Sequence, residues 1–167
     1  MGVIGKRNKD KKPIKKKREY NNDSHKELIE IVAKWLKKHT NNAQIPNCPY
    51  IAKDLMTNTD NGEIPDVIGW NYWTSVLIEV KVSRQDFLKD QNKKFRYMPE
   101  LGMGEFRYYC CPEGLIKEEE LPEGWGLLYL NDKNKIDTIK IADRKESNLM
   151  CERTMLLSLI RRNKIAL

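Results

Sequence analysis

Apolar residues recur with two different periods along this chain, and the change of period separates expected helices from expected strands. From Ser24 to about His39 the spacing is three or four residues, which predicts an amphipathic helix. Ser24 and Glu27 form a capping-box pattern at the expected start of this helix. A Pro- and Asn-rich segment, 41–49, then precedes a short expected strand within 48–56. The apolar stripe of the helix consists of Leu28, Ile31, Val32, Trp35 and Leu36.

Two apolar runs, 64–70 and 75–82, are separated by four residues and predict a β-hairpin. If Trp70 faces Ser75, Asp66 lies directly opposite Glu79, where Cβ atoms are about 4.5–5.5 Å apart. Lys81 shares the face of Glu79, because residues two apart in a strand point the same way. A register shift of one residue would separate Asp66 from the other two side chains.

The second half of the chain continues the alternation. The capping pattern Ser83-Arg84-Gln85-Asp86 predicts a helix to about Tyr97, with Phe87, Gln91 and Phe95 on one stripe. We then expect strands at 105–111 and 124–130, an edge strand at 135–142, and an amphipathic helix at 147–162 whose stripe is Leu149, Leu156, Leu159 and Ile160. This order predicts an α/β fold with a mixed central sheet flanked by helices.

Charge divides the chain of 167 residues into a tail and one expected domain, 21–167. Residues 1–20 hold nine Lys or Arg against two acidic residues, which accounts for the whole net charge of +7. We expect this tail to be disordered and to bind a phosphate backbone, unless it is only a solubilising extension. The basic residues nearest the domain are Lys15, Lys16, Lys17 and Arg18.

Composition also bears on location and on cysteine chemistry. No apolar run approaches the roughly 20 residues of a membrane span, and the chain does not open with a secretory signal pattern, so we expect a cytoplasmic protein without a membrane partner. The cysteines lack C-x-x-C spacing, so buried thiols are expected rather than zinc ligands or disulfides. They are Cys48, Cys110, Cys111 and Cys151, and the adjacent pair is expected to face opposite sides of a strand.

The candidate chemistry lies in the hairpin, where Asp66, Glu79 and Lys81 interrupt apolar runs. Unpaired charge is costly in a central strand, so three charged groups at matched spacing indicate a site. Two neighbouring carboxylates remain ionised together only when a cation compensates them, and their oxygens suit Mg²⁺. Lys81 would then orient a water molecule or stabilise charge on phosphorus. The alternative is a Glu79–Lys81 salt bridge on an exposed sheet face.

These residues resemble a known family. Pro65-Asp66, followed after twelve residues by Glu79-Val80-Lys81, resembles the motif of the PD-(D/E)XK nuclease superfamily, whose restriction-endonuclease-like core runs helix, three strands, helix, strand. Short prokaryotic and phage-encoded members are the most similar, and the resemblance covers about 25–145. It also rests on the segments Val82-Ser83-Arg84-Gln85-Asp86-Phe87-Leu88, Gly102-Met103-Gly104, Arg107-Tyr108-Tyr109 and Leu121-Pro122-Glu123-Gly124-Trp125-Gly126.

The resemblance implies a metal site and a catalytic lysine. Asp66 and Glu79 would ligate Mg²⁺, with Mn²⁺ expected to substitute, the Val80 carbonyl would contribute, and Lys81 would take the lysine role. Many members add a first-helix Glu, for which Glu27 is the leading candidate here and Glu30 the second. Glu63 differs in parity from Asp66, so an extended strand would turn it to the other face. His25 is expected to be exposed rather than catalytic.

Basic residues after the motif are candidates for contact with nucleic-acid phosphates: Arg84, Lys93, Lys94 and Arg96. The alternative is a solvated helix face with pairs such as Asp90–Lys94. Arg107 is expected to point into the cleft, whereas Tyr108 and Tyr109 are expected to pack.

The function expected from the sequence is metal-dependent, endonucleolytic hydrolysis of DNA phosphodiesters in the cytoplasm of a prokaryotic or phage-infected cell. Two alternatives stay open. One is a non-catalytic nucleic-acid-binding or partner-docking module on the same fold, since fold does not determine function. The other is a nuclease specialised for RNA or branched DNA. Whether the protein is a homodimer is also open.

Overall fold

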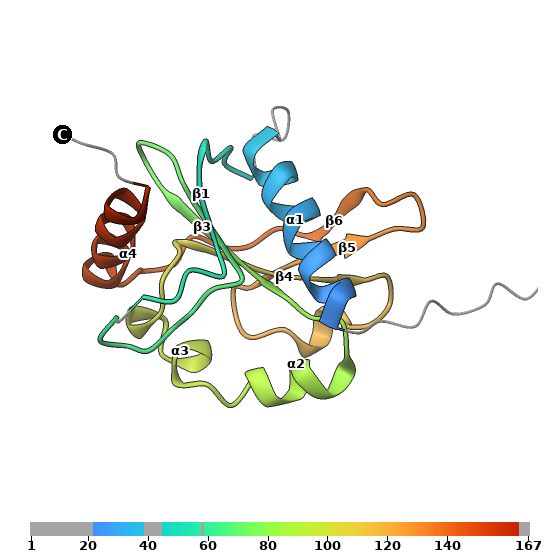
Figure 1. The fold of residues 1–167 in the computed structure, drawn as a ribbon. Helices are drawn as coiled ribbons and strands as arrows, with labels where there is room; N and C mark the ends of the chain where they lie inside the picture. The colour runs from blue at the N-terminus through green and yellow to red at the C-terminus, as the bar shows by residue number, and fades with distance from the viewer. Residues whose placement is uncertain (1–21, 39–44, 58, 164–167) are drawn as a thin grey trace, which may run out of the picture.

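The computed structural model describes residues 22–38, 45–57 and 59–163, which form an α/β fold (Figure 1). The basic tail and its residues Lys15, Lys16, Lys17 and Arg18 lie outside the described residues. Two short 3₁₀ helices, η1 (Pro99–Leu101) and η2 (Glu118–Glu120), lie between the main elements. Those elements are α1 (Asn22–Lys38), β1 (Tyr50–Lys53), β2 (Val67–Trp70), β3 (Ser75–Val80), α2 (Arg84–Asp90), α3 (Lys94–Tyr97), β4 (Phe106–Pro112), β5 (Gly126–Leu130), β6 (Ile136–Lys140) and α4 (Leu149–Arg162).

The strands form one mixed sheet in the order β1-β2-β3-β4-β5-β6. Pairs β1–β2, β2–β3 and β5–β6 are antiparallel, whereas β3–β4 and β4–β5 are parallel. A parallel pair needs a crossover, which α2 and α3 supply between β3 and β4. The predicted mixed sheet with flanking helices is confirmed.

The predicted register of the β2–β3 hairpin is also confirmed, because Trp70 pairs with Ser75 and Val67 with Ile78. Asn71 fixes the turn: its side-chain oxygen accepts hydrogen bonds from the backbone N–H groups of Trp73 and Thr74 at 2.8 and 2.9 Å. This is the local bonding that favours Asn in turns. Asp66 therefore lies one residue beyond the paired stretch, on the side of Glu79.

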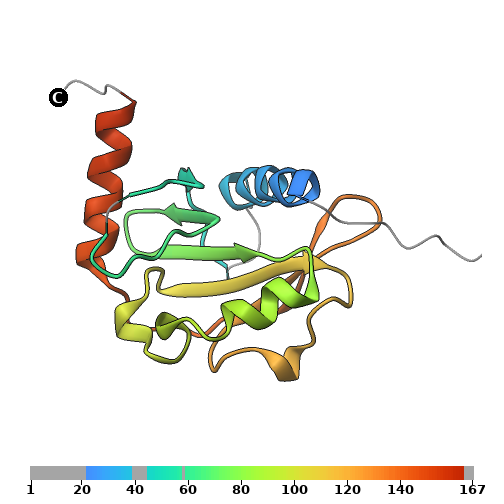
Figure 2. The ribbon, with the colours of Figure 1, turned by 60° about the horizontal axis from the view of Figure 1, so that its bottom comes forward.

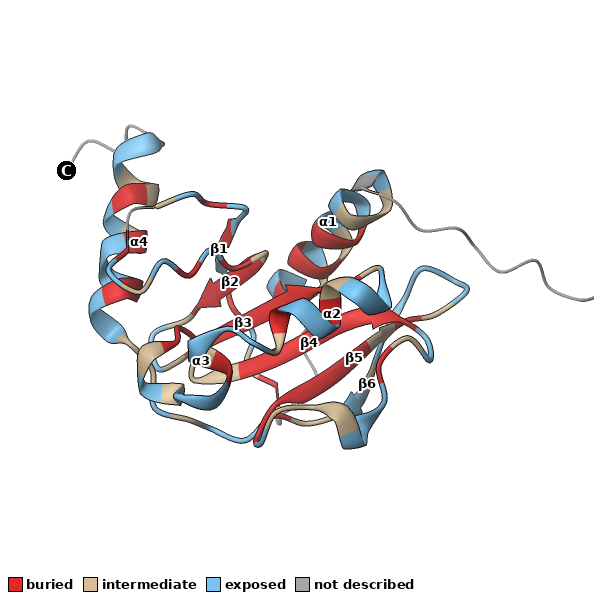
Figure 3. Ribbon diagram, turned by 90° about the horizontal axis from the view of Figure 1, so that it is seen from below, coloured by how far each residue is buried: buried red, intermediate tan, exposed pale blue. Residues whose placement is uncertain are grey.

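Helices lie on both faces of the sheet (Figure 2), and an apolar core of buried residues lies between the sheet and the helices on each face (Figure 3). One core packs α1 against alternate strand residues such as Ile78 and Cys110, and the other joins α2 and α4 to the opposite set, including Leu77 and Cys111. The four cysteines are buried free thiols, and the adjacent pair faces opposite cores, as predicted. No helix within the described residues is both long and apolar enough to cross a membrane.

Three helix predictions need correction. Helix α1 begins at Asn22, before the predicted cap Ser24. The helix expected over 84–97 is broken into α2 and α3, because Lys93 takes an extended conformation (φ −71°, ψ 136°). The predicted apolar stripe of α4 is only partly correct: Leu156 and Leu159 pack against a core, but Leu149 is 68% exposed, and the buried positions are Cys151, Glu152, Met155 and Ser158.

Glu152 explains the orientation of α4. Its buried carboxylate accepts hydrogen bonds from Trp70 Nε1 at 2.9 Å, Ser75 Oγ at 2.9 Å and the Gly104 N–H at 2.8 Å, and from Ser147 Oγ. Gly104 has φ +82°, and a Cβ there would lie 2.5 Å from Leu77 Cβ, so a larger residue would not allow this close approach. Glu152 thus connects the last helix to β2, β3 and the loop before β4.

Candidate active site

The three charged residues predicted from the hairpin lie together where β3 ends. Lys81 Nζ donates a hydrogen bond to Glu79 Oε2 at 3.1 Å and lies 3.9 Å from Asp66 Oδ2. Asp66 Oδ2 also accepts a hydrogen bond of 2.7 Å from the Val80 N–H, which holds this carboxylate against the end of β3. The Glu79–Lys81 salt bridge of the alternative interpretation is present, but both residues are buried and do not lie on an exposed sheet face.

Lys81 is surrounded by carboxylates from two elements. Besides Glu79 and Asp66, its ammonium lies 3.6 Å from Asp90 Oδ1 and 3.9 Å from Asp86 Oδ2, both on α2. Burial alone lowers the pKa of a lysine, but Glu79 and the other carboxylates outweigh it and raise the pKa of Lys81 above its usual value. The side chain is therefore a fixed cation near neutral pH.

The negative charge of Glu79 is balanced by a cation at each carboxylate oxygen, Lys81 at Oε2 and Arg96 at Oε1. Burial would raise the pKa of this carboxyl, but Arg96 and Lys81 together hold that pKa below its usual range. Arg96 Nη2 is 3.1 Å from Glu79 Oε1, yet its orientation makes no hydrogen bond, and Oε1 is buried without a hydrogen-bond partner. Glu79 Oε1 is therefore paired with Arg96 through charge and not through a hydrogen bond.

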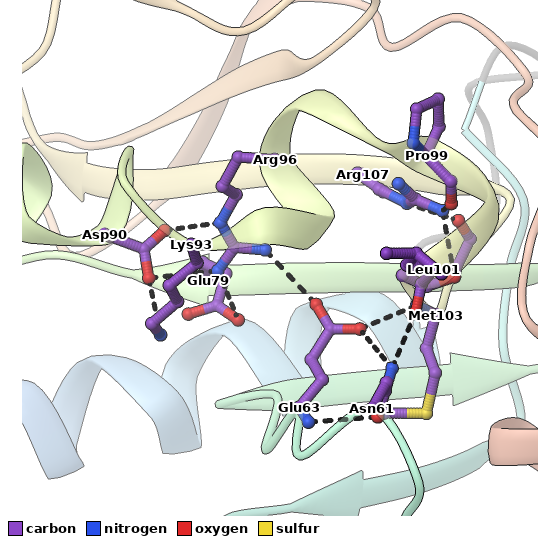
Figure 4. Close-up of polar contacts among 12 residues, drawn as sticks. Asn61, Glu63, Glu79, Asp90, Lys93, Arg96, Pro99, Leu101, Met103 and Arg107 are labelled. Atoms are coloured by element: carbon purple, nitrogen blue, oxygen red, sulfur yellow. Dashed lines mark hydrogen bonds and ion pairs between the residues drawn. The ribbon is translucent and has the colours of Figure 1, made fainter.

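Arg96 is the centre of a buried polar network (Figure 4). Its guanidinium donates to Asp90 at 2.6 and 3.0 Å and to Glu63 at 3.2 Å. The guanidinium carbon lies 4.7 Å from the centre of the Trp125 ring, a cation–π distance. Asp90 also accepts from Tyr109 Oη at 2.7 Å, and although burial opposes the shift, hydrogen bonds from Arg96 hold the pKa of Asp90 well below its usual range.

Glu63 belongs to this network, which corrects the expectation that it faces away. The residue is not in a strand, so the parity argument does not apply to it. Its Oε2 accepts from the Met103 N–H at 2.6 Å, and its backbone N–H donates to Asn61 Oδ1 at 3.0 Å. Burial raises the pKa of Glu63 to about 7, although Arg96 and the Met103 N–H act in the opposite direction.

The raised pKa of Glu63 gives a stability prediction. Between pH 4.5 and about 7 the folded state binds this proton more strongly than the unfolded state, so the free energy of unfolding falls as pH rises through that window. The fall due to Glu63 should reach about 3 kcal/mol. Urea denaturation of wild type and Glu63→Gln at several pH values checks this, because the variant cannot titrate. Parallel pH profiles for the two proteins would contradict the assignment.

His25 is the site residue that the sequence did not reveal. It was expected to be exposed, but α1 brings its Nε2 to 3.2 Å from the Val80 carbonyl oxygen and 3.6 Å from Asp66 Oδ2. Interaction with the Asp66 carboxylate raises the pKa of the imidazole, although burial of the ring opposes this. Helix α1 therefore places His25 beside Asp66, whereas Glu27 is exposed and Glu30 forms an ion pair with Lys53.

The oxygen and nitrogen atoms of Asp66, Val80 and His25 are of the types that bind a divalent cation. Their spacing is slightly wider than that around a bound ion. An octahedral Mg²⁺ with bonds of 2.0–2.1 Å places neighbouring ligands about 3 Å apart. The spacings of 3.2 and 3.6 Å from His25 Nε2 to Val80 O and to Asp66 Oδ2 are slightly larger. Among the described residues, no three His, Cys, Asp or Glu side chains are grouped to hold a metal as they stand.

The charge balance also favours an added cation. Four carboxylates of the network are largely buried, namely Glu63, Asp66, Glu79 and Asp90, whereas Lys81 and Arg96 are the cations buried among them. Lys93, which lies 2.7 Å from Asp90, and His25 are more exposed and stand at the rim. Buried carboxylates in excess of buried cations are costly unless a proton or a cation compensates them.

Two of the predicted phosphate contacts are corrected by the structure. Arg96 and Arg107 are 5% and 2% exposed, so their guanidinium groups do not reach the surface. Arg107 donates to the carbonyl oxygens of Gly104, Pro99, Gly102 and Glu146, and thereby holds the loop before β4. Tyr108 and Tyr109 are buried in the core, as predicted.

The other predicted contacts remain on the surface. Lys93 and Lys94 are exposed at the start of α3, although Lys93 is paired with Asp90. Arg84 is exposed and paired with Glu120, which connects α2 to η2. These side chains can meet a phosphate group without a change in the core.

Comparison with protein-family models, with curated proteins and with solved structures found no match to this chain. Functional assignment therefore depends on the geometry of the site.

Proposed function

We propose that this protein is a metal-dependent nuclease that hydrolyses DNA phosphodiesters on a restriction-endonuclease-like core. The observation that carries the proposal is the convergence of Asp66, Glu79 and Lys81 at the end of β3, with Lys81 Nζ within 3.9 Å of both carboxylates. The order α1, β1–β3, α2, β4 agrees with the core that the sequence motif implies. A salt bridge needs only two oppositely charged side chains. The presence of a third charged group at the same strand end therefore favours a catalytic site.

Each group has a definite task in such a reaction. Asp66, Glu79, the Val80 carbonyl and His25 would hold a Mg²⁺ ion, which when bound polarises a phosphoryl oxygen and makes a bound water more acidic. Lys81 carries a fixed positive charge beside both carboxylates, so it would orient the attacking water or stabilise the negative charge that develops on the phosphate. Burial of the site strengthens these charge interactions.

The surface beside the site supports a nucleic-acid substrate. Lys89, Lys93 and Lys94 are exposed along α2 and α3, and Tyr97 in the same segment is 65% exposed. Lysine ammonium groups bind the phosphate backbone, and exposed aromatic rings stack on bases. This face adjoins the site through Lys93, which contacts Asp90 of the buried network.

A second candidate function is a binding module without turnover on the same fold. It is favoured by one observation: Lys81 and Arg96 already balance the charge of Glu79 without a metal. A module of this kind would bind nucleic acid through the exposed lysines of α2 and α3.

One experiment separates the two functions. Circular, linear, single-stranded and branched DNA and an RNA are incubated with the full chain in Mg²⁺, Mn²⁺ or EDTA. The nuclease proposal predicts nicking or linearisation of circular DNA with Mg²⁺ or Mn²⁺ and none with EDTA, and this activity must co-elute with the protein on a size-exclusion column. A gel shift without cleavage under every metal condition would instead establish the binding module.

A further inference from the structure

Arg96 differs from Lys81 in how it is anchored. Its hydrogen bonds go to Asp90 and Glu63, which come from α2 and from the loop before β2, and neither residue is a proposed metal ligand. The planar guanidinium engages both oxygens of Asp90, a bidentate geometry that fixes its orientation. Figure 4 shows the guanidinium between these two carboxylates and beside Glu79.

Glu79 receives only the charge of Arg96. The distance from Arg96 Nη2 to Glu79 Oε1 is 3.1 Å, but Oε1 has no hydrogen-bond partner. Among the described residues this is the one buried carboxylate oxygen in that condition. A buried oxygen without a hydrogen bond is costly, so its persistence inside a dense polar network calls for a specific cause.

The charge of Arg96 does not by itself oppose a second cation. The ionised carboxylate of Asp90 already balances the guanidinium, and Glu63 adds negative charge when it is ionised, so the group of three side chains is not positive. The Arg96 side chain is also excluded from solvent, so it is not itself a surface contact for substrate. The main effect of the Arg96 guanidinium is therefore on the position of the Glu79 carboxylate and not on the approach of a cation.

We infer that Arg96 is a positioning residue: anchored by Asp90 and Glu63, it holds the Glu79 carboxylate in place at the end of β3 through its ion pair with Oε1. This inference rests on the proposed function. The arginine prepares the site before the metal arrives, so its loss should be seen in metal affinity without any substrate present.

The test measures Mn²⁺ binding to the full-length chain by the loss of the free-ion EPR signal, without nucleic acid. Arg96→Gln should bind Mn²⁺ at least tenfold more weakly than wild type. The matched control is Arg107→Gln, which also removes a buried arginine, but one bonded to backbone carbonyls; it should bind Mn²⁺ as wild type does. Unchanged or tighter binding by Arg96→Gln would overturn the inference.

Arg96→Lys serves if Arg96→Gln does not fold, as judged by circular dichroism. It keeps the charge but lacks the two-pronged geometry, so its Mn²⁺ affinity should lie between those of wild type and Arg96→Gln, and wild-type affinity would overturn the inference. In cleavage assays Arg96→Lys should raise the Mg²⁺ concentration for half-maximal rate while the rate at saturation recovers, a split that simple loss of stability does not produce. Wild type that does not bind Mn²⁺ defeats the proposed function itself, whereas wild-type binding with an unaffected Arg96 variant defeats only the role of Arg96.

Discussion

Replacing Asp66 by Asn is expected to lower the rate of Mg²⁺-dependent cleavage by roughly a thousandfold or more, while the protein stays folded. The amide keeps an oxygen that accepts the 2.7 Å hydrogen bond from the Val80 N–H, so the end of β3 retains its geometry. It loses the negative charge next to Lys81 and His25 that a divalent ion would need. Loss of a single charge-stabilising group in an active site commonly costs on the order of 10²–10³ in rate, and a metal ligand should cost more.

The measurement is the single-turnover rate of circular-DNA nicking, accompanied by thermal unfolding of each protein. Asp60→Asn is the matched control, because it removes an exposed carboxylate from the loop that leads to β2. It should cleave as wild type does. An Asp66→Asn protein that is folded and retains more than a tenth of the wild-type rate would be incompatible with Asp66 as a metal ligand.

The position of Asp66 relative to Glu79 was accessible from sequence because it depends on local rules. The four-residue loop and the two-residue period of strands fix which residues oppose each other once Trp70 faces Ser75. The confirmed opposite orientation of Cys110 and Cys111 has the same origin. In a hairpin whose two faces are both buried, the alternation of side chains and the residues of the turn are strong predictors of the register.

His25 could not be found in that way. Its contact with Val80 joins residues 55 positions apart, and it depends on how α1 packs across the sheet. A first-turn helix residue with a polar side chain is usually solvated, and nothing in the local pattern distinguishes this one. The only available signal was that many members of the family that the sequence resembles add a first-helix Glu, which favoured Glu27 by residue type and did not point to a histidine.

Arg96 shows a different limit of sequence reasoning. A run such as Lys93, Lys94, Arg96 has the same appearance whether the charges face solvent or the interior. The burial of Arg96 depends on three carboxylates, Glu63, Glu79 and Asp90, that come from separate segments. The break between α2 and α3 accompanies this burial, because Lys93 leaves helical geometry before the chain turns inward. The ion pairs of Arg96 with Glu63, Glu79 and Asp90 thus accompany a break in the helix predicted from the apolar pattern.

The second large expected effect is a loss of stability when Glu152, which sets the orientation of α4, is replaced. Glu152→Ala should lower the free energy of unfolding by about 4 kcal/mol, because it leaves Trp70 Nε1, Ser75 Oγ and the Gly104 N–H without their acceptor inside the protein. Hydrogen bonds to a charged group contribute more than neutral ones, and unpaired buried donors add a desolvation cost. For a chain of this size the midpoint of thermal unfolding should fall by roughly 10 °C.

Urea denaturation followed by tryptophan fluorescence measures this change, since Trp70 donates directly to Glu152. Arg153→Ala is the neighbouring control: its exposed side chain contacts Met150 on the same helix, so the change should stay within about 0.5 kcal/mol. Glu152→Gln should be intermediate, because the amide retains one acceptor oxygen but directs its NH₂ group at other donors. Equal stability of Glu152→Ala and Arg153→Ala would contradict this prediction. The packing of α4 would then depend on its apolar contacts alone, and the four hydrogen bonds to Glu152 would not set the helix orientation.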